Sequence, residues 1–138
     1  MRLLMSVTSV LLLAVAANGC SDSISPQLIV GLWEQDGSPA GNSLQIQLAL
    51  NGSAISGQGS WCGEALACGS TSTTGVVTGN KIHLVTSFDD GRVETFDGNL
   101  TSSNSLVGSG RDTTPGGMIE LPHAQSFHRL IGDPPRTQ

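Results

Sequence analysis

The feature that most constrains the fold of this chain is a series of short alternating segments separated by glycine-containing turns. In the clearest of them, residues 44–50, leucine and isoleucine alternate with glutamine and alanine. A period of two is typical of a β-strand with one buried face. Asn51-Gly52 follows this segment, and the dipeptide is typical of a two-residue hairpin turn. The chain from Ile55 to Trp61 is therefore predicted to return antiparallel to it.

The same succession of strand and turn recurs along the chain. Its 18 glycines disfavour helices, because each glycine inside a helix costs about 1 kcal/mol relative to alanine. Gly79-Asn80, Asp89-Asp90-Gly91 and residues 102–104 are predicted turns, and residues 112–123 form a longer loop rich in proline and glycine. The predicted strands cover residues 28–33, 44–50, 55–61, 69–78, 81–88, 92–101, 105–111 and 124–131.

About eight strands at spacings of about ten residues, nearly all joined by hairpins, indicate an antiparallel barrel or sandwich. Glycines inside the strands permit the sharp coiling of a small closed barrel, and closure removes exposed strand edges. We therefore predict an all-β fold, a small antiparallel up-and-down barrel over residues 28–131, with a β-sandwich as the alternative. The strand glycines are Gly57, Gly59, Gly75, Gly98, Gly108 and Gly110.

The first 19 residues have the parts of a secretory signal peptide. Arg2 is the only charged residue before Asp22, and an almost unbroken apolar run extends to Ala17. A positive start, a short apolar stretch and small residues at its end are typical of an export signal. The run is too short for a membrane span, which needs about 20 apolar residues. We expect residues 1–19 to be removed on export.

Residues 16–20, Ala-Ala-Asn-Gly-Cys, resemble the lipobox of bacterial lipoproteins. In that family a small residue, here Gly19, precedes a cysteine that receives a diacylglyceryl thioether and becomes the first residue of the mature protein. The resemblance implies that Cys20 carries acyl chains such as palmitate. It also implies that the protein is anchored by lipid to the cell envelope.

Two positions of this segment depart from the lipobox pattern. Ala17 stands where the family prefers leucine, and Asn18 stands where a smaller residue is usual. Ordinary signal cleavage near Ala16 or Gly19 is therefore the alternative. Ser21 resembles the outer-membrane sorting pattern of enterobacteria, which implies a site on the periplasmic face or in the outer membrane.

The cysteine count supports the lipid interpretation independently. The chain has three cysteines, Cys20, Cys62 and Cys68, and an odd cysteine in an exported protein requires an explanation. If Cys20 is acylated, the other two form one disulfide around residues 63–67. A metal site is the rival, although two cysteines without a nearby histidine are weak zinc ligands. Residues 20–27 would then be a tether, and residues 132–138 a loose tail.

The charge of the chain excludes some partners. Arg2 is one of six basic residues, so residues 20–138 keep five against all eleven acidic ones, a formal charge of −6. Nucleic acids and anionic lipid surfaces select basic patches. We therefore expect no nucleic-acid partner, and membrane contact only through the N-terminal lipid.

Gly31-Leu32-Trp33 on the first predicted strand and Arg129 on the last resemble the calycin superfamily of lipocalin-like and avidin-like barrels. In that family the tryptophan of a G-x-W motif closes one end of the barrel and packs against a basic residue of the final strand. The resemblance implies a cation–π contact between Trp33 and Arg129. The long helix of lipocalins is missing, and an avidin-like biotin pocket needs more aromatic residues than this chain has.

No motif for catalysis or for a cofactor is present in the sequence. His83, His123 and His128 lack the spacing of a zinc hydrolase, and no serine has a nucleophile-elbow motif. The acidic residues 89–97 could bind calcium, but Asp89-Asp90-Gly91 is a good hairpin turn and no calcium-loop motif occurs. We predict that the protein is not an enzyme and that it holds no metal or cofactor.

Two non-enzymatic functions remain. The first is a lipocalin-like barrel that binds a small apolar ligand in an internal cavity lined by Leu44, Ile46, Leu48 and Leu50. The alternative is an envelope interaction or inhibitor protein that binds a protein partner through the Cys62–Cys68 loop, with Trp61 beside it. The apolar residues Met118, Ile119 and Leu121 of the long loop are predicted to form a lid or an edge strand.

Overall fold

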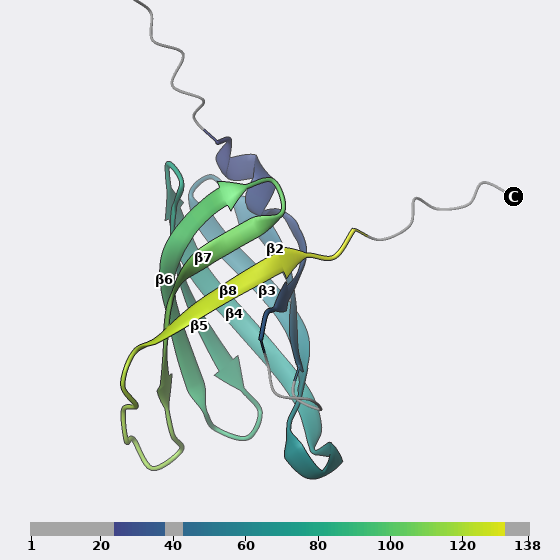
Figure 1. Ribbon diagram of the computed structural model, residues 1–138, viewed down its shortest axis with the longest axis vertical. Coiled ribbons are helices and arrows are strands. Elements are labelled where there is room, and N and C mark those ends of the chain that lie inside the picture. Colours follow the sequence, from purple (N-terminus) through teal and green to yellow (C-terminus); the bar gives the residue numbers. More distant parts are fainter. Residues whose placement is uncertain (1–23, 38–42, 132–138) are drawn as a thin grey trace, which may run out of the picture.

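A computed structural model describes residues 24–37 and 43–131 of the chain. Within them, eight antiparallel strands close into one barrel (Figure 1). The predicted signal peptide, the acylated Cys20 and the tail at 132–138 lie outside the described residues. The strands are β1 (Gly31–Gln35), β2 (Ser43–Asn51), β3 (Ala54–Cys62), β4 (Cys68–Thr78), β5 (Lys81–Phe88), β6 (Val93–Ser102), β7 (Ser105–Thr113) and β8 (His123–Arg129).

The order of the strands around the barrel is their order in the chain. Each strand pairs with the next, and β8 returns to pair with β1 through Trp33 opposite Arg129 and Gln35 opposite Phe127. This topology confirms the predicted up-and-down barrel and replaces the alternative of a sandwich. It follows from the short hairpins, because a two-residue turn can only join antiparallel neighbours.

The first predicted strand is shorter than expected. The apolar character of residues 28–30 predicts that they belong to it, but Pro26–Ile29 form a 3-10 helix, η1, and β1 begins at Gly31. Proline favours the first turn of a helix because its φ is already fixed near the helical value. The turn directs Ile29 into the end of the barrel, where it is fully buried and accepts a hydrogen bond of 2.8 Å from Trp33 Nε1.

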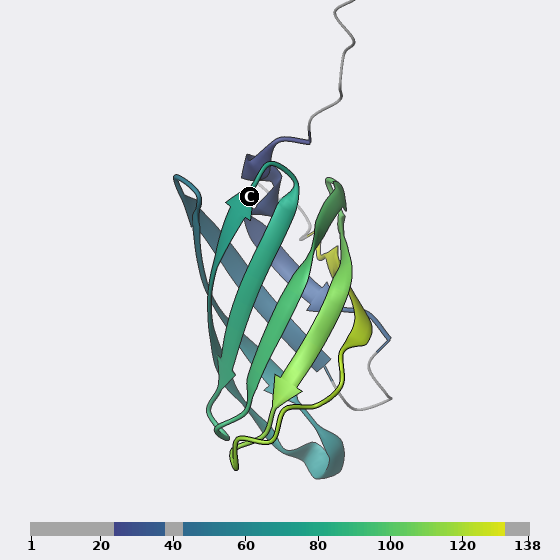
Figure 2. The same ribbon diagram turned by 90° about the vertical axis from the view of Figure 1, so that its left-hand side faces the viewer.

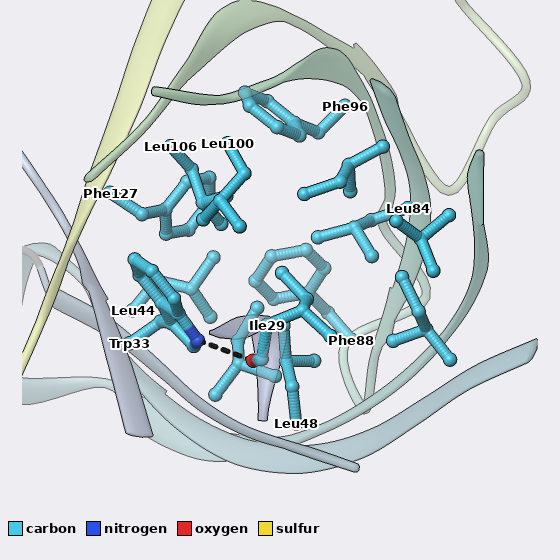
Figure 3. Close-up of a cluster of buried hydrophobic side chains, with 14 residues drawn as sticks. Ile29, Trp33, Leu44, Leu48, Leu84, Phe88, Phe96, Leu100, Leu106 and Phe127 are labelled. Atoms are coloured by element: carbon cyan, nitrogen blue, oxygen red, sulfur yellow. Dashed lines mark hydrogen bonds between the residues drawn. The ribbon is translucent and has the colours of Figure 1, made fainter. Parts of the chain in front are cut away.

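The barrel interior holds a single apolar cluster (Figure 3). It forms because residues at every second position of each strand point inward. Inward-facing glycines leave room for large neighbours in this narrow space: a Cβ at Gly98 would lie 2.5 Å from Cζ of Phe96. The buried apolar residues are Ile29, Trp33, Leu44, Ile46, Leu48, Ile55, Val77, Ile82, Leu84, Phe88, Phe96, Leu100, Leu106 and Phe127.

The two ends of the barrel differ. The end at which β1 begins is closed by η1, and we call it the plugged end (Figures 1 and 2). The opposite end, which we call the mouth, is formed by the ends of strands near Gln35, Cys62, Phe88 and His123. The Cys62–Cys68 disulfide and a second 3-10 helix, η2 (Glu64–Leu66), lie at the mouth. No helix of the described ranges is long and apolar enough to cross a membrane.

Candidate functional site

A cavity of about 340 Å³ opens at the mouth of the barrel. The aromatic side chains of Trp61 and Phe88 line one part of it, and Leu44 adds an aliphatic surface. Acidic and basic side chains line another part, namely those of Asp36, Arg92, Glu94, Asp112 and His123. The volume is near the lower end of the range of about 300–1,000 Å³ for small-molecule sites. The cavity therefore suits a small ligand.

The inward positions toward the mouth include several polar residues, whereas those nearer the plugged end are apolar. Thr73 and Thr86 face each other across β4 and β5 with their hydroxyl oxygens 3.0 Å apart, and both are buried. Thr71 is also buried, and its Oγ1 has no hydrogen-bond partner within the described residues. A buried hydroxyl without a partner carries a desolvation cost. Polar side chains at these buried positions contribute less to the stability of the barrel than apolar ones would. Their presence therefore indicates a role other than stability.

Glu94 and Gln125 form the most deeply buried polar pair of the site. Glu94 is 6% exposed and Gln125 is 5% exposed, and both line the cavity. Gln125 Nε2 donates a hydrogen bond of 2.8 Å to Glu94 Oε1. Gln125 Oε1 has no partner among the described side chains and backbone. The pair thus offers more acceptors than donors.

Burial raises the pKa of Glu94 to about 7, because desolvation penalises the charged carboxylate. The hydrogen bond from Gln125 lowers this pKa, the nearby Asp112 carboxylate raises it, and His123 lowers it. Asp112 lies directly opposite Glu94 in the pairing of β6 with β7. A carboxyl group whose pKa is strongly raised and which lines a cavity is typical of a functional site.

Trp61 is held at the mouth by a carboxylate. Its Nε1 donates a hydrogen bond of 2.8 Å to Asp89 Oδ1, and the backbone N–H of Ser70 donates one of 2.8 Å to Asp89 Oδ2. These two donors lower the pKa of Asp89, the Ser70 amide more than the indole. The ring of Trp61 also meets Phe88 edge to face, with centroids 6.1 Å apart. The aromatic wall of the cavity is therefore fixed before any ligand binds.

Arg92 covers this aromatic wall. Its guanidinium carbon lies 4.7 Å from the ring centre of Trp61 and 4.3 Å from that of Phe88. Arg92 Nε also donates a hydrogen bond of 2.8 Å to Asp90 Oδ2. The positive charge of Arg92 is therefore already paired with a carboxylate.

The rim of the mouth carries another acidic group. Asp36 follows β1 and accepts a hydrogen bond of 2.8 Å from Ser126 Oγ, and its Oδ1 lies 2.5 Å from His128 Nδ1. His128 also lies 3.5 Å from a carboxylate oxygen of Glu34. These contacts join the end of β1 to β8 and keep the rim closed.

The four leucine and isoleucine residues predicted to line a cavity lie in different surroundings. Leu44 lines the mouth cavity. Ile46 and Leu48 are 1% exposed and pack inside the apolar cluster, and Leu50 packs against that cluster while partly buried. They do not surround one space, because the side chains of Trp33 and Ile29 pack into the same interior. The space open to a ligand lies nearer the mouth, where polar residues also line it.

The predicted contact between Trp33 and Arg129 is present at the plugged end. The Arg129 guanidinium carbon lies 4.7 Å from the ring centre of Trp33. Arg129 also donates hydrogen bonds to three backbone carbonyls, those of Leu28, Val30 (2.5 Å) and Ser103 (2.8 Å). It therefore joins η1 and the β6–β7 turn to the end of the barrel, and takes no part in the mouth cavity.

The remaining chemistry-bearing residues are dispersed. Cys62 and Cys68 form the predicted disulfide. Asp97 lies on the outer wall with an oxygen 2.6 Å from His83 Nδ1, whereas Asp89 and Asp90 bind Trp61 and Arg92. The acidic residues 89–97 thus point in different directions. Within residues 24–37 and 43–131, no group of three or more histidine, cysteine, aspartate or glutamate side chains could hold a metal ion.

The long loop before β8 makes a small hairpin of its own. Thr113 forms an isolated bridge with Ile119, and the backbone N–H of Thr114 donates to Met118 O at 2.9 Å. Met118, Ile119 and Leu121 are 70%, 63% and 87% exposed. They point to solvent and do not line the cavity. The loop is therefore a protruding edge beside the mouth.

No protein-family model matches the chain, and no curated protein is significantly similar to it. The site is therefore interpreted from its own geometry.

Proposed function

We propose that this protein is an exported, lipid-anchored barrel that binds a small ligand in its mouth cavity. The observation that carries the proposal is a cavity of about 340 Å³ whose floor is a buried Glu94–Gln125 pair with unused hydrogen-bonding capacity. Buried polar groups without partners are costly. A ligand that supplies the missing partners would recover that free energy.

The lining supports a ligand with at least one polar group. Trp61, Phe88 and Leu44 offer surface for an apolar body, whereas Glu94 and Gln125 require a hydrogen-bonding group. A site of this kind, with an apolar wall and a few convergent polar groups, is typical of specific small-molecule recognition. A purely apolar ligand would leave the polar groups desolvated and unpaired.

The position of the plugged end is consistent with lipid anchoring through Cys20. The first described residue, Ile24, comes two positions before η1, which closes that end, and four positions after Cys20. An extended chain spans at most about 3.6 Å per residue. An acylated Cys20 would therefore hold the plugged end near the membrane and leave the mouth facing the aqueous compartment, from which the ligand would enter.

Native mass spectrometry of the protein isolated gently from its own cell envelope tests this function. Gln35 points inward at the mouth and lines the cavity, so Gln35→Trp would fill the cavity. Gln58 lies on the exposed outer face of β3, and Gln58→Trp is the matched control. We expect a bound small molecule with the natural protein and the control, and none with Gln35→Trp. Equal retention by both variants would place the ligand elsewhere.

The alternative, a protein partner bound through the Cys62–Cys68 loop, is favoured by one observation. Met118, Ile119 and Leu121 expose apolar surface on the long loop before β8, at the same end of the barrel as the Cys62–Cys68 loop, and exposed apolar patches are typical of interaction sites. Replacing these three residues together with serine would abolish capture of a partner that spans both loops. Under the ligand proposal, the same variant keeps its bound small molecule.

A further inference from the structure

We propose that the ligand of the mouth cavity is a small organic cation, with an ammonium or guanidinium group that binds Glu94. The inference rests on the proposed function and names the ligand class of the same site. Glu94 lines the cavity, is 6% exposed, accepts a hydrogen bond from Gln125 and interacts with the side chain of Asp112. A buried carboxylate with free acceptor positions is suited to a charged donor.

The arrangement of Gln125 adds a second requirement for donors. Its amide nitrogen donates a hydrogen bond to Glu94, and its amide oxygen has no partner within the described residues. Asp112 lies opposite Glu94 and adds further acceptor oxygens. An ammonium group has three donors and no acceptor, and a guanidinium group has five donors. Such a group satisfies a floor built from acceptors.

The charges around the cavity disfavour an anion. Asp36, Glu94 and Asp112 line the cavity, and Arg92 is the only arginine or lysine of the described ranges that does. The Arg92 guanidinium is already paired with Asp90 and stacked over Trp61 and Phe88. A carboxylate ligand would meet the carboxylates of Glu94 and Asp112 at close range, and like charges in a site of low dielectric repel strongly.

The aromatic wall gives the apolar part of the ligand its place. Trp61 is fixed by Asp89, and Phe88 is 8% exposed. A compact ring or short chain could lie against these residues while its charged group reaches Glu94. The size of the cavity, about 340 Å³, excludes a long acyl chain as the whole occupant.

Binding of a cation should strengthen as pH rises from about 6 to about 8. The groups that face Glu94 are Asp112 on β7, His123 and Gln125 on β8, Thr86 on β5, Arg92 before β6 and Asp36 after β1. Because burial raises the pKa of Glu94 to about 7, the carboxylate gains its charge in this interval.

The two tryptophans provide the measurement. Trp61 lines the cavity, whereas Trp33 is fully buried at the plugged end, so their two indole N–H signals report on the site and on an internal control. The exported full chain, labelled with ¹⁵N, is titrated at pH 8 with cyclohexylammonium, cyclohexanecarboxylate and cyclohexanol, which share one ring. We expect cyclohexylammonium to shift the Trp61 signal and to leave that of Trp33 unchanged.

Each outcome decides one point. Response only to the carboxylate or the alcohol would overturn the cation and leave the proposed function standing, whereas no response to any probe would overturn both. Glu94→Gln should weaken cyclohexylammonium binding by about tenfold to a hundredfold and remove its pH dependence. Glu64→Gln removes the same charge from an exposed position in η2 and should bind as the natural chain does. Unchanged binding by Glu94→Gln would also overturn the cation site.

Discussion

Gln125 Nε2 donates a hydrogen bond of 2.8 Å to Glu94 Oε1 and so joins β8 to β6 inside the barrel. The strand between them, β7, has Gly110 at this level, and a Cβ there would collide with the Gln125 side chain. The pair therefore depends on a third position that has no side chain. Because this arrangement buries a carboxyl group, it makes the stability of the barrel depend on pH.

The first prediction concerns Glu94 and stability. Burial raises its pKa in the folded protein from 4.5 to about 7. An acidic group whose pKa is raised by folding stabilises the folded state, and this stabilisation is fully present below the pKa of the unfolded chain. It is lost as pH rises through the pKa of the folded protein. We expect Glu94→Gln, which imitates the neutral acid, to be more stable than the natural chain above pH 7, by up to roughly 3 kcal/mol.

Denaturation by urea between pH 4 and pH 9 measures this difference. The gap between Glu94→Gln and the natural chain should be small near pH 4 and should widen up to about pH 8. Glu64→Gln is the control, because Glu64 is exposed in η2. A gap that stays constant over the whole range would show that Glu94 does not titrate as its burial implies.

The sequence predicts that Glu94 and Gln125 both face the barrel interior, but it does not predict that they contact each other. Glu94 lies two positions before Phe96, and Gln125 lies two positions before Phe127. Residues two apart in a strand share a face, so both polar residues are expected on the inner face with the two phenylalanines. The density of acidic residues near Asp89 indicates a turn or a calcium site there, and not a polar pair inside the barrel. The meeting of Glu94 with Gln125 across β7 depends on barrel closure and on Gly110, which no local pattern indicates.

Most of the fold was predictable because each hairpin is a local feature. The alternation in residues 44–50 and the turn at Asn51-Gly52 determine a strand pair by themselves. The sequence does not predict the 3-10 turn of η1, because its apolar residues are equally typical of a strand. In the folded protein Ile29 packs into the barrel end and its carbonyl accepts a hydrogen bond from Trp33 Nε1. Packing at the barrel end, and not local preference, decides this segment.

The second prediction concerns the plugged end. Arg129 donates to the backbone carbonyls of Leu28, Val30 and Ser103 and lies over the ring of Trp33. Lysine keeps the charge but cannot reproduce this planar set of donors. We expect Arg129→Lys to lower the free energy of unfolding by about 2 kcal/mol, measured by urea denaturation. Arg111→Lys, on the exposed face of β7, should change it by less than about 0.5 kcal/mol. Equal effects would assign no special role to Arg129.

The third prediction concerns the disulfide at the mouth. Cys62 and Cys68 close a short loop, and closure of a loop this short stabilises the fold by about 2 kcal/mol in the chain-entropy model. We expect the double substitution of both cysteines with alanine to lose about this amount in urea denaturation. Trp61 should stay in place, because Asp89 holds its indole independently. Its indole N–H signal should therefore keep its chemical shift, and a large change would show that the disulfide positions the cavity wall.

The last prediction joins the lipid anchor to the direction of the mouth. If Cys20 is acylated, mass spectrometry of the mature N-terminus finds lipid on it, and Cys20→Ala is released from the membrane fraction with its stability unchanged.

Because Ile24 lies at the plugged end only four residues later, that end should stay near the bilayer. A fluorophore at Asn80, in the β4–β5 turn of the plugged end, should then be quenched by nitroxide lipid headgroups. A fluorophore at Pro115, in the exposed loop beside the mouth, should be quenched much less. Equal quenching at the two positions would contradict this orientation, and an unmodified thiol at Cys20 would contradict the anchor itself.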